Sequence, residues 1–150
     1  MIEGSDQAAI ANELQGELRD LLCLAVFGDH VRWVLAGEEV AEFAQWLADS
    51  VGQWRVWADQ VATRLVGLGV APDGRVRSLA KDVPFNWVPD GWLDLDEARQ
   101  LVGVRVSRVA GWAQARSSQV SDPETGRLFD AVCSGLEVQA ADFPRAAEQV

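Results

Sequence analysis

The stretch of sequence that decides the fold is residues 40–68, VAEFAQWLADSVGQWRVWADQVATRLVGL. Its apolar residues recur at alternating steps of four and three, at Val40, Ala44, Leu47, Val51, Trp54, Ala58, Val61, Leu65 and Leu68. This period places all of them along one side of an α-helix. Polar residues fall off the stripe, at Glu42, Gln45, Asp49, Gln53 and Gln60. With Gly69 suited to the left-handed end of a helix, the pattern predicts a helix over residues 39–68.

A second apolar stripe precedes this helix, at Ile10, Leu14, Leu18, Leu21 and Ala25. The acidic residues Glu13, Glu17 and Asp20 lie mostly outside this stripe. Gly37 is placed to end a helix over residues 6–36. Because the connection that follows is short, the two helices should form an antiparallel pair.

Two more helices are predicted after Gly91. Asp94 and Glu97 have the spacing of a capping box, and an apolar stripe follows it at Ala98, Val102, Val106, Val109 and Ala113. The next start signal is Asp122-Pro123-Glu124, which combines a helix cap, a first-turn proline and an N-terminal acid. These signals predict helices over residues 94–118 and 122–143.

The connections between the four helices are unequal in length. Residues 69–92 form a long linker that contains several glycines and prolines, whereas the other two connections are short. A long linker inside a compact domain usually has a structural task, here to carry the chain along the bundle. The sequence therefore predicts an all-α, ferritin-like four-helix bundle, one domain over residues 1–150, with one long crossover between helices two and three.

The composition narrows the classes of function. The formal net charge is −10, which disfavours direct DNA binding because phosphate recognition needs a basic surface. The longest apolar run, residues 21–27, is far too short for a membrane span, and no secretory signal is visible, so a cytoplasmic protein is expected. Cys23 and Cys133 are expected to be reduced, buried thiols.

Three short motifs resemble those of the Dps family of mini-ferritins. They are Arg32-Trp33 with Gly37, the element Asp59-Gln60-Val61-Ala62-Thr63-Arg64, and Leu68-Gly69-Val70-Ala71-Pro72-Asp73-Gly74. Their order and spacing match the family along nearly the whole chain. The resemblance implies a hollow dodecameric shell in which iron is oxidised between two subunits.

The resemblance also locates the ligands of that iron centre. The family uses two histidines from one subunit, which fall at Arg32 and Ala44, and an aspartate and a glutamate from its neighbour, which fall at Asp59 and Thr63. Iron needs carboxylate and imidazole donors, and arginine has no lone pair to donate. Asp59 is left as a remnant metal ligand, so the ferroxidase centre is expected to be lost. Arg32 and Asp59 either pair across the subunit boundary or find other partners.

Seven tryptophans occur without a single tyrosine. Five are candidates for contacts between subunits, with a ligand pocket or the ordinary core as the alternatives: Trp33, Trp46, Trp57, Trp87 and Trp92. Among these, Trp87 and Trp92 are the better ligand candidates because they lie in the linker, and loops often carry function. Trp54 belongs to the apolar stripe of the second helix.

Charged residues suggest two further sites. Asp122, Glu124 and Asp130 begin the fourth helix, where shells of the Dps family have acidic pores, although capping alone accounts for Asp122 and Glu124. The basic residues of the third helix and the linker are expected to form a solvated face, with anion binding as the alternative. They are Arg99, Arg105, Arg108, Arg116, Arg75, Arg77 and Lys81.

The leading hypothesis is a Dps-like homologue that forms an oligomeric shell for iron storage or stress protection and has lost its conventional ferroxidase centre. Iron is the one cofactor that the resemblance implies. A second hypothesis is an interaction protein that co-assembles with a paralogous subunit or another partner. A third is a bundle that has been reused as a ligand-binding protein or an enzyme.

Overall fold

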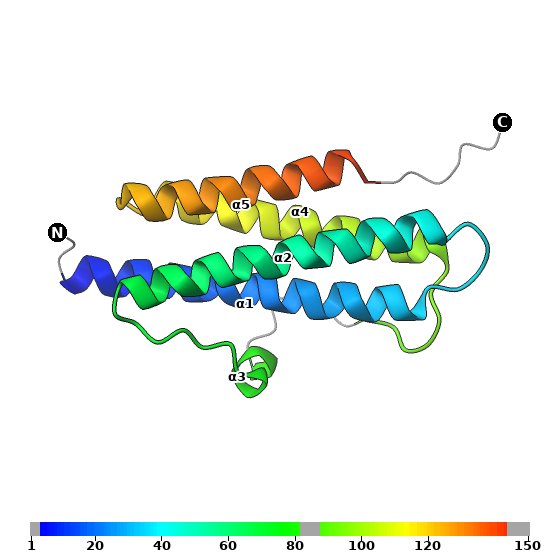
Figure 1. Ribbon diagram of the computed structural model, residues 1–150, viewed down its shortest axis with the longest axis horizontal. Helices are drawn as coiled ribbons and strands as arrows, with labels where there is room; N and C mark the ends of the chain where they lie inside the picture. Colours follow the sequence, from blue (N-terminus) through cyan, green and yellow to red (C-terminus); the bar gives the residue numbers. More distant parts are fainter. Residues whose placement is uncertain (1–3, 82–87, 144–150) are drawn as a thin grey trace.

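The structure is a computed structural model, and it describes residues 4–81 and 88–143. These residues contain the helices α1 (Gly4–Val34), α2 (Ala41–Gly67), α3 (Val76–Lys81), α4 (Leu95–Gln119) and α5 (Pro123–Ala141). Four long helices lie side by side, and α3 projects from the crossover (Figure 1). The predicted all-α bundle is confirmed, with helix ends that differ from the predicted ones by at most two residues.

The crossover runs as predicted. Helices α1 and α2 form one antiparallel hairpin and α4 and α5 form another, and α4 begins at the end of the bundle where α2 begins (Figure 1). A bridge fixes this arrangement, because the Ala36 N–H donates to the Leu93 carbonyl and the Leu93 N–H donates to the Val34 carbonyl, both at 2.9 Å. The end of α1 and the end of the crossover are thereby held together.

The predicted helix signals act locally as expected. The Asp94 carboxylate accepts from the Glu97 N–H at 2.9 Å and caps α4, and the Asp122 carboxylate accepts from the Thr125 N–H at 3.2 Å and caps α5. Gly69 has a φ of 77°, the left-handed conformation that suits the end of α2. Each of these ends is thus specified by a side chain or a glycine close to it in sequence.

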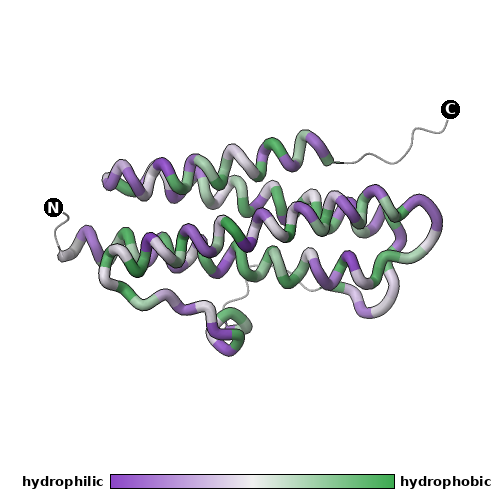
Figure 2. Tube along the Cα trace, viewed as in Figure 1, coloured by the Kyte–Doolittle hydropathy of each residue, from purple (hydrophilic) through white to green (hydrophobic). Residues whose placement is uncertain are grey.

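The core forms where the apolar stripes meet, and Figure 2 shows apolar and polar residues alternating along the turns of the helices. Trp54 is fully buried, and its indole N–H donates to Gln139 Oε1 at 2.7 Å. Two glycines make room for tryptophans. A methyl group at Gly28 would lie 2.7 Å from Cζ3 of Trp54, and one at Gly135 would overlap the ring of Trp57. Large side chains on α2 therefore pack directly against the backbone of α1 at Gly28 and of α5 at Gly135.

Some predictions about exposure are wrong. Glu17 and Asp20, which lie mostly outside the predicted apolar stripe, are nevertheless 0% and 1% exposed. Arg105 is also buried, with its guanidinium 3.9 Å from the centroid of the Phe27 ring. Cys133 is buried and free as predicted, but the free thiol of Cys23 is only half-buried. The charged groups were misplaced because residue type alone does not reveal a partner from a distant helix.

No helix in the described part of the chain is long and apolar enough to cross a membrane.

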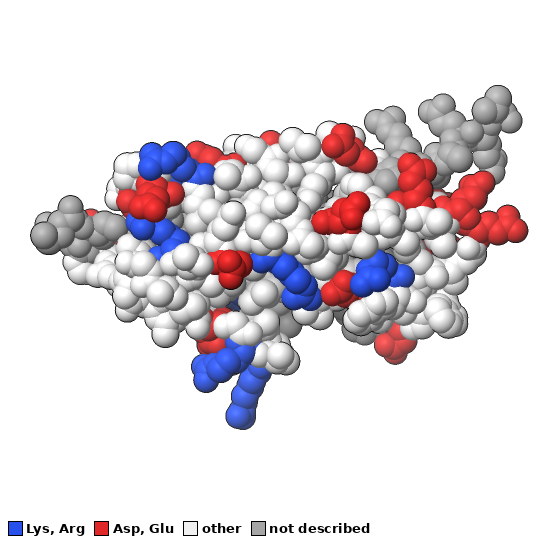
Figure 3. Space-filling view, viewed as in Figure 1, with Lys and Arg blue, Asp and Glu red and all other residues white. Residues whose placement is uncertain are grey.

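Several of the charged residues that were expected in solvent lie on the surface. Basic side chains project from the region of α3, where Arg75, Arg77 and Lys81 are exposed, and acidic ones gather at the end that holds the α1–α2 connection (Figure 3). These linker cations are solvated as predicted.

Candidate functional site

The four positions that the resemblance assigns to iron ligands lie on α1 and α2. Arg32, in the last turn of α1, donates through Nη2 to Asp29 Oδ1 at 3.0 Å, and its side chain is 33% exposed. Ala44 is partly buried near the start of α2, and Asp59 and Thr63 are exposed one turn apart further along it. Only one of the four residues is a carboxylate or an imidazole, so they do not fit an iron centre.

Asp29 holds Arg32 in place from within the same chain. Its other oxygen, Oδ2, lies 3.1 Å from Nη2 of Arg55 on α2, so one carboxylate bridges two guanidiniums across the α1–α2 hairpin. Arg32 thus has an intrachain partner. A pair between Arg32 and Asp59 of another subunit stays a prediction.

A second stripe runs along α2, on the side away from the core. It comprises five exposed residues at steps of four and three: Gly52, Val56, Asp59, Thr63 and Val66. We call it the outer α2 stripe. Its members are small or apolar apart from Asp59, and Val56 and Val66 are 49% and 62% exposed. A stripe of this kind suits close packing against another helix.

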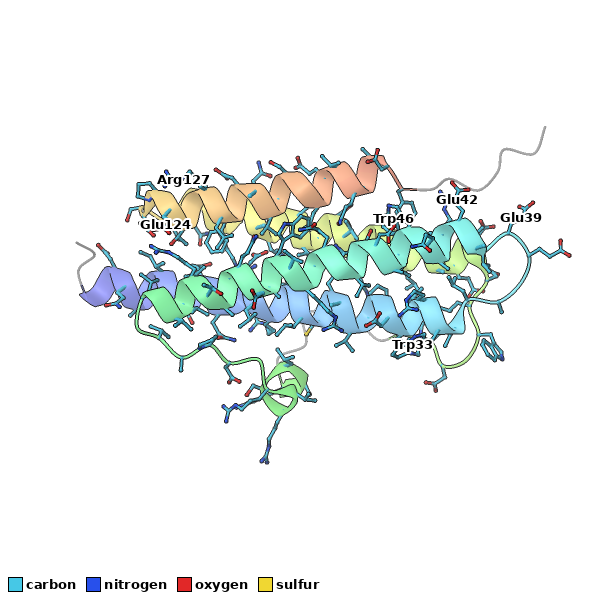
Figure 4. The ribbon with its side chains drawn as sticks, viewed as in Figure 1. Trp33, Glu39, Glu42, Trp46, Glu124 and Arg127 are labelled. Atoms are coloured by element: carbon cyan, nitrogen blue, oxygen red, sulfur yellow. The ribbon has the colours of Figure 1, made fainter. Side chains whose placement is uncertain are left out.

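The candidate tryptophans separate into two groups. Trp57 is largely buried within the chain, and Trp46 is half-buried, stacked on Phe43 at 5.7 Å between ring centroids. Core packing therefore accounts for Trp57. Its side chain is too buried to make the predicted contact with another subunit. Trp33 and Trp92 are 65% and 74% exposed, and Figure 4 shows Trp33 near the end of α1. Trp87 lies outside the described residues.

The acidic pore candidates lie at and near the start of α5, where Figure 4 labels Glu124. Arg64 of α2 contacts two of them, at 2.6 Å from Asp122 Oδ2 and 2.9 Å from Glu124 Oε2. The Thr125 hydroxyl and Arg64 hold the pKa of Asp122 below its usual value. Asp130 accepts a hydrogen bond from the Ser117 hydroxyl. Two of the three acids thus share a cation within the chain, and a pore role remains a prediction.

A cluster that the sequence did not reveal lies between α1 and α4. Nη1 of Arg116 lies 2.6 Å from Oε2 of Glu17 and 2.6 Å from Oδ2 of Asp20. Nε of Arg116 is 3.6 Å from Oε2 of Glu13, a third carboxylate from α1. The Arg116 side chain is 13% exposed, so this guanidinium is inserted among acids in the interior. We call these four residues the buried carboxylate cluster.

Burial changes the acidity of this cluster. Desolvation raises the pKa of Glu17 to about 7, and the neighbouring carboxylates of Asp20 and Glu13 add to the rise, while Arg116 opposes it. Desolvation likewise raises the pKa of Asp20, again against Arg116. Glu17 Oε1 and Asp20 Oδ1 are buried without a hydrogen-bond partner among the described residues. The cluster therefore has less donor capacity than its ionised carboxylates require.

One sequence signal points to the cluster in hindsight. Gly16 lies in the middle of α1, where glycine costs about 1 kcal/mol relative to alanine. A methyl group at Gly16 would lie 2.8 Å from Nη2 of Arg116. The glycine thus leaves room for the guanidinium beside Glu17. In the sequence, this arrangement corresponds to a Gly-Glu pair within a helix, next to an apolar stripe.

No group of three or more His, Cys, Asp or Glu side chains suited to a metal ion occurs within residues 4–81 and 88–143. The side-chain groups that the structure does bring together are the buried carboxylate cluster, the Arg64 contacts at α5 and the Asp29 bridge. All three are ion pairs built around arginine.

Comparison with solved structures identifies the fold. No family model matches the chain, and no curated protein matches it. Among solved structures, Dps92 from Deinococcus radiodurans is 23% identical, with a TM-score of 0.89 over 93% of this chain and 86% of that one. Dps from Microbacterium arborescens in its high iron form is 20% identical, with a TM-score of 0.88 over 95% of each chain.

A third similar structure is antigen TpF1 from Treponema pallidum, 16% identical, with a TM-score of 0.86 over 95% of this chain and 94% of that one. Identities of 16% to 23% establish a shared architecture and leave the activity open. The chain therefore has the ferritin-like four-helix fold of Dps proteins.

Proposed function

We propose that this chain forms an oligomeric Dps-like shell, serving iron storage or stress protection, without the conventional ferroxidase centre between subunits. The observation that carries the proposal is the pairing of a Dps-type fold with Arg32, Ala44 and Thr63 at three of the four positions where the family places iron ligands. Iron is the cargo in this proposal, and no oxidation step is assigned to these residues.

The outer surface of the α1–α2 hairpin supports assembly. The outer α2 stripe leaves Val56 and Val66 exposed, and α1 exposes Val26 and Trp33, seven residues apart and thus on one face. Burial of such apolar area against a second copy would be favourable at roughly 25 cal/mol per Å². Asp59 lies in the middle of this stripe, where an arginine of a second copy can reach it.

The charge at the ligand positions supports the loss of iron oxidation. Asp29 is shared by Arg32 and Arg55, so these three groups keep one net positive charge. One such charge repels a cation about 4 Å away by about 4 kcal/mol per unit charge at an effective dielectric constant of ~20. Asp59 offsets part of this repulsion. It cannot supply the imidazole and carboxylate donors that Ala44 and Thr63 lack.

Assembly is tested by native mass. We expect the purified protein to form a closed homo-oligomer and Val56→Arg to break it into smaller species, because the substitution places a charge in an apolar contact. The matched control is Val138→Arg on α5, where the valine is similarly exposed. A monomeric parent protein would contradict the shell and favour the hypothesis of an interaction protein that needs a paralogous subunit.

Iron chemistry is tested by adding ferrous iron in air to the metal-free protein and following ferric absorbance. We expect a rate equal to that of a protein-free control. Oxidation well above the control that is abolished by Asp59→Ala would show that another site has replaced the expected one.

The same assay offers a restoration experiment. The triple variant Arg32→His, Ala44→His and Thr63→Glu returns the family's donors to their positions and is expected to oxidise iron if the subunit contact of the family is retained. Activity in this variant and not in the parent supports a lapsed ferroxidase. If neither oxidises iron while the native mass shows a closed shell, the subunits meet through a different contact.

A further inference from the structure

The charges of the buried carboxylate cluster do not balance. Glu13, Glu17 and Asp20 contribute three carboxylates, and Arg116 is the guanidinium that they share. A second cation, Arg19, contacts the cluster, with its Nε 3.8 Å from Oδ1 of Asp20. Three carboxylates against two guanidiniums leave one surplus negative charge, and a surplus charge in the interior is costly.

Glu17 is the carboxyl where the surplus is most costly. It is fully buried, and its Oε1 has no hydrogen-bond partner among the described residues. Glu13 is 31% exposed, so water stabilises its charge. Asp20 has Arg19 as well as Arg116 beside it. One added proton is therefore best placed on Glu17.

Apart from Arg116 of α4, no cation among the described residues acts on Glu17. At this level of the α1–α2 hairpin the buried residues of α2 are apolar, at Ala58, Val61 and Leu65. The charged residues of α2 in this stretch are Asp59, which is exposed, and Arg64, which contacts Asp122 and Glu124.

Helix α5 adds acids to the surroundings of Glu17. Cys133 is close enough that Glu17 contributes to the raised pKa of its thiol, whose larger causes are burial and Glu137. The Cys133 thiol donates to Glu137 Oε1 at 3.5 Å, and Asp130 also raises the pKa of this thiol. The charged groups of α5 that act on the Cys133 thiol, next to Glu17, are thus acidic.

We propose that Glu17 is a buried proton-binding site and that its proton controls how firmly α1 is held against α4. With the proton bound, the carboxylates of Asp20 and Glu13 balance the guanidiniums of Arg116 and Arg19, so the cluster together with Arg19 is neutral. Loss of the proton leaves an uncompensated charge between the two helices. The proposal does not depend on whether the chain forms a shell.

The pH range follows from the pKa of Glu17, which burial raises from 4.5 to about 7. A folded-state pKa above the unfolded one means that the stabilisation is fully present below about pH 4.5 and is lost as the pH rises through about 7. Between pH 5.5 and 8, Glu17 alone should lower the folding equilibrium constant about 30-fold.

The first test is infrared spectroscopy of the intact parent protein, in the presence of a chelator. We expect the carbonyl band of a protonated carboxylic acid at pH 6, its loss by pH 8, and its absence from Glu17→Gln at both values. The matched control is Glu42→Gln, which removes an exposed acid of α2 outside the cluster and should keep the band. A parent protein with only ionised carboxylates at pH 6 would overturn the proposal.

The second test is urea unfolding between pH 5.5 and 8. Between pH 5.5 and 8, the folding equilibrium constant of the parent protein and of Glu42→Gln should fall about 30-fold more than that of Glu17→Gln. Equal pH dependence in all three proteins would also overturn the proposal. If Glu17→Gln does not fold, the infrared titration of the parent decides, because an internal carboxyl with its midpoint near pH 7 is required.

Discussion

Trp54→Ala is expected to lower the free energy of unfolding by about 3–5 kcal/mol, as large-to-small core substitutions do. The Trp54 side chain is fully buried and lies against Gly28 of α1, so neighbouring side chains cannot readily fill the space that it leaves. The substitution also removes the indole N–H that donates to Gln139 at 2.7 Å. Against a total stability of roughly 5–15 kcal/mol, this is a large share of the margin.

The measurement is urea unfolding of Trp54→Ala beside Trp92→Ala. Trp92 is 74% exposed, so its removal should change stability by less than about 0.5 kcal/mol. Trp54→Phe, which keeps most of the volume and loses the hydrogen bond, should fall between the two. A larger effect at Trp92 than at Trp54 would mean that the buried face of α2 is misassigned.

Arg116→Met is the second substitution with a large expected effect, about 3–5 kcal/mol at pH 8. It removes the cation that Glu17 and Asp20 contact at 2.6 Å and leaves two buried carboxylates without it. The effect should shrink at pH 5.5, because burial raises the pKa of both carboxyls and protonation removes their charge. Urea unfolding at the two pH values measures the difference.

Two variants control for the loss of the long side chain. Arg75→Ala removes an exposed arginine paired with Asp73 and should leave stability almost unchanged, since exposed ion pairs contribute little. The triple variant Arg116→Met, Glu17→Leu and Asp20→Leu removes the acids with the cation and should recover most of the loss. Failure of the triple variant to recover stability would mean that packing, not charge, dominates at Arg116.

Local signals in the sequence predicted most of the fold. The apolar stripe of residues 40–68 identified α2 and the burial of Trp54, because a helix that packs on one side repeats its apolar residues every three or four positions. Asp94 and Asp122 marked the starts of α4 and α5, because a cap acts on backbone groups only two or three residues away. The long crossover followed from the unequal connections.

The candidate site was predicted less well. The resemblance placed Arg32 and Asp59 at positions where the family has iron ligands, but the partner of Arg32 in the chain is Asp29. Asp29 and Arg32 lie three positions apart on α1, a spacing at which two side chains on a helix can make contact. The outer α2 stripe has the same four-and-three spacing as the core stripe. It was not predicted from the sequence, because Gly52, Asp59 and Thr63 are not typical apolar residues.

The sequence by itself determined the helices, their order and the residues that fill the apolar core, because these depend on periodicity and on caps within a few residues. Only the tertiary structure decided that Glu17 and Asp20 are buried and that Arg116 lies between them, 99 and 96 residues further along the chain. A carboxylate avoids the interior unless a cation meets it there. Whether that cation arrives depends on how two helices pack, which no local pattern records.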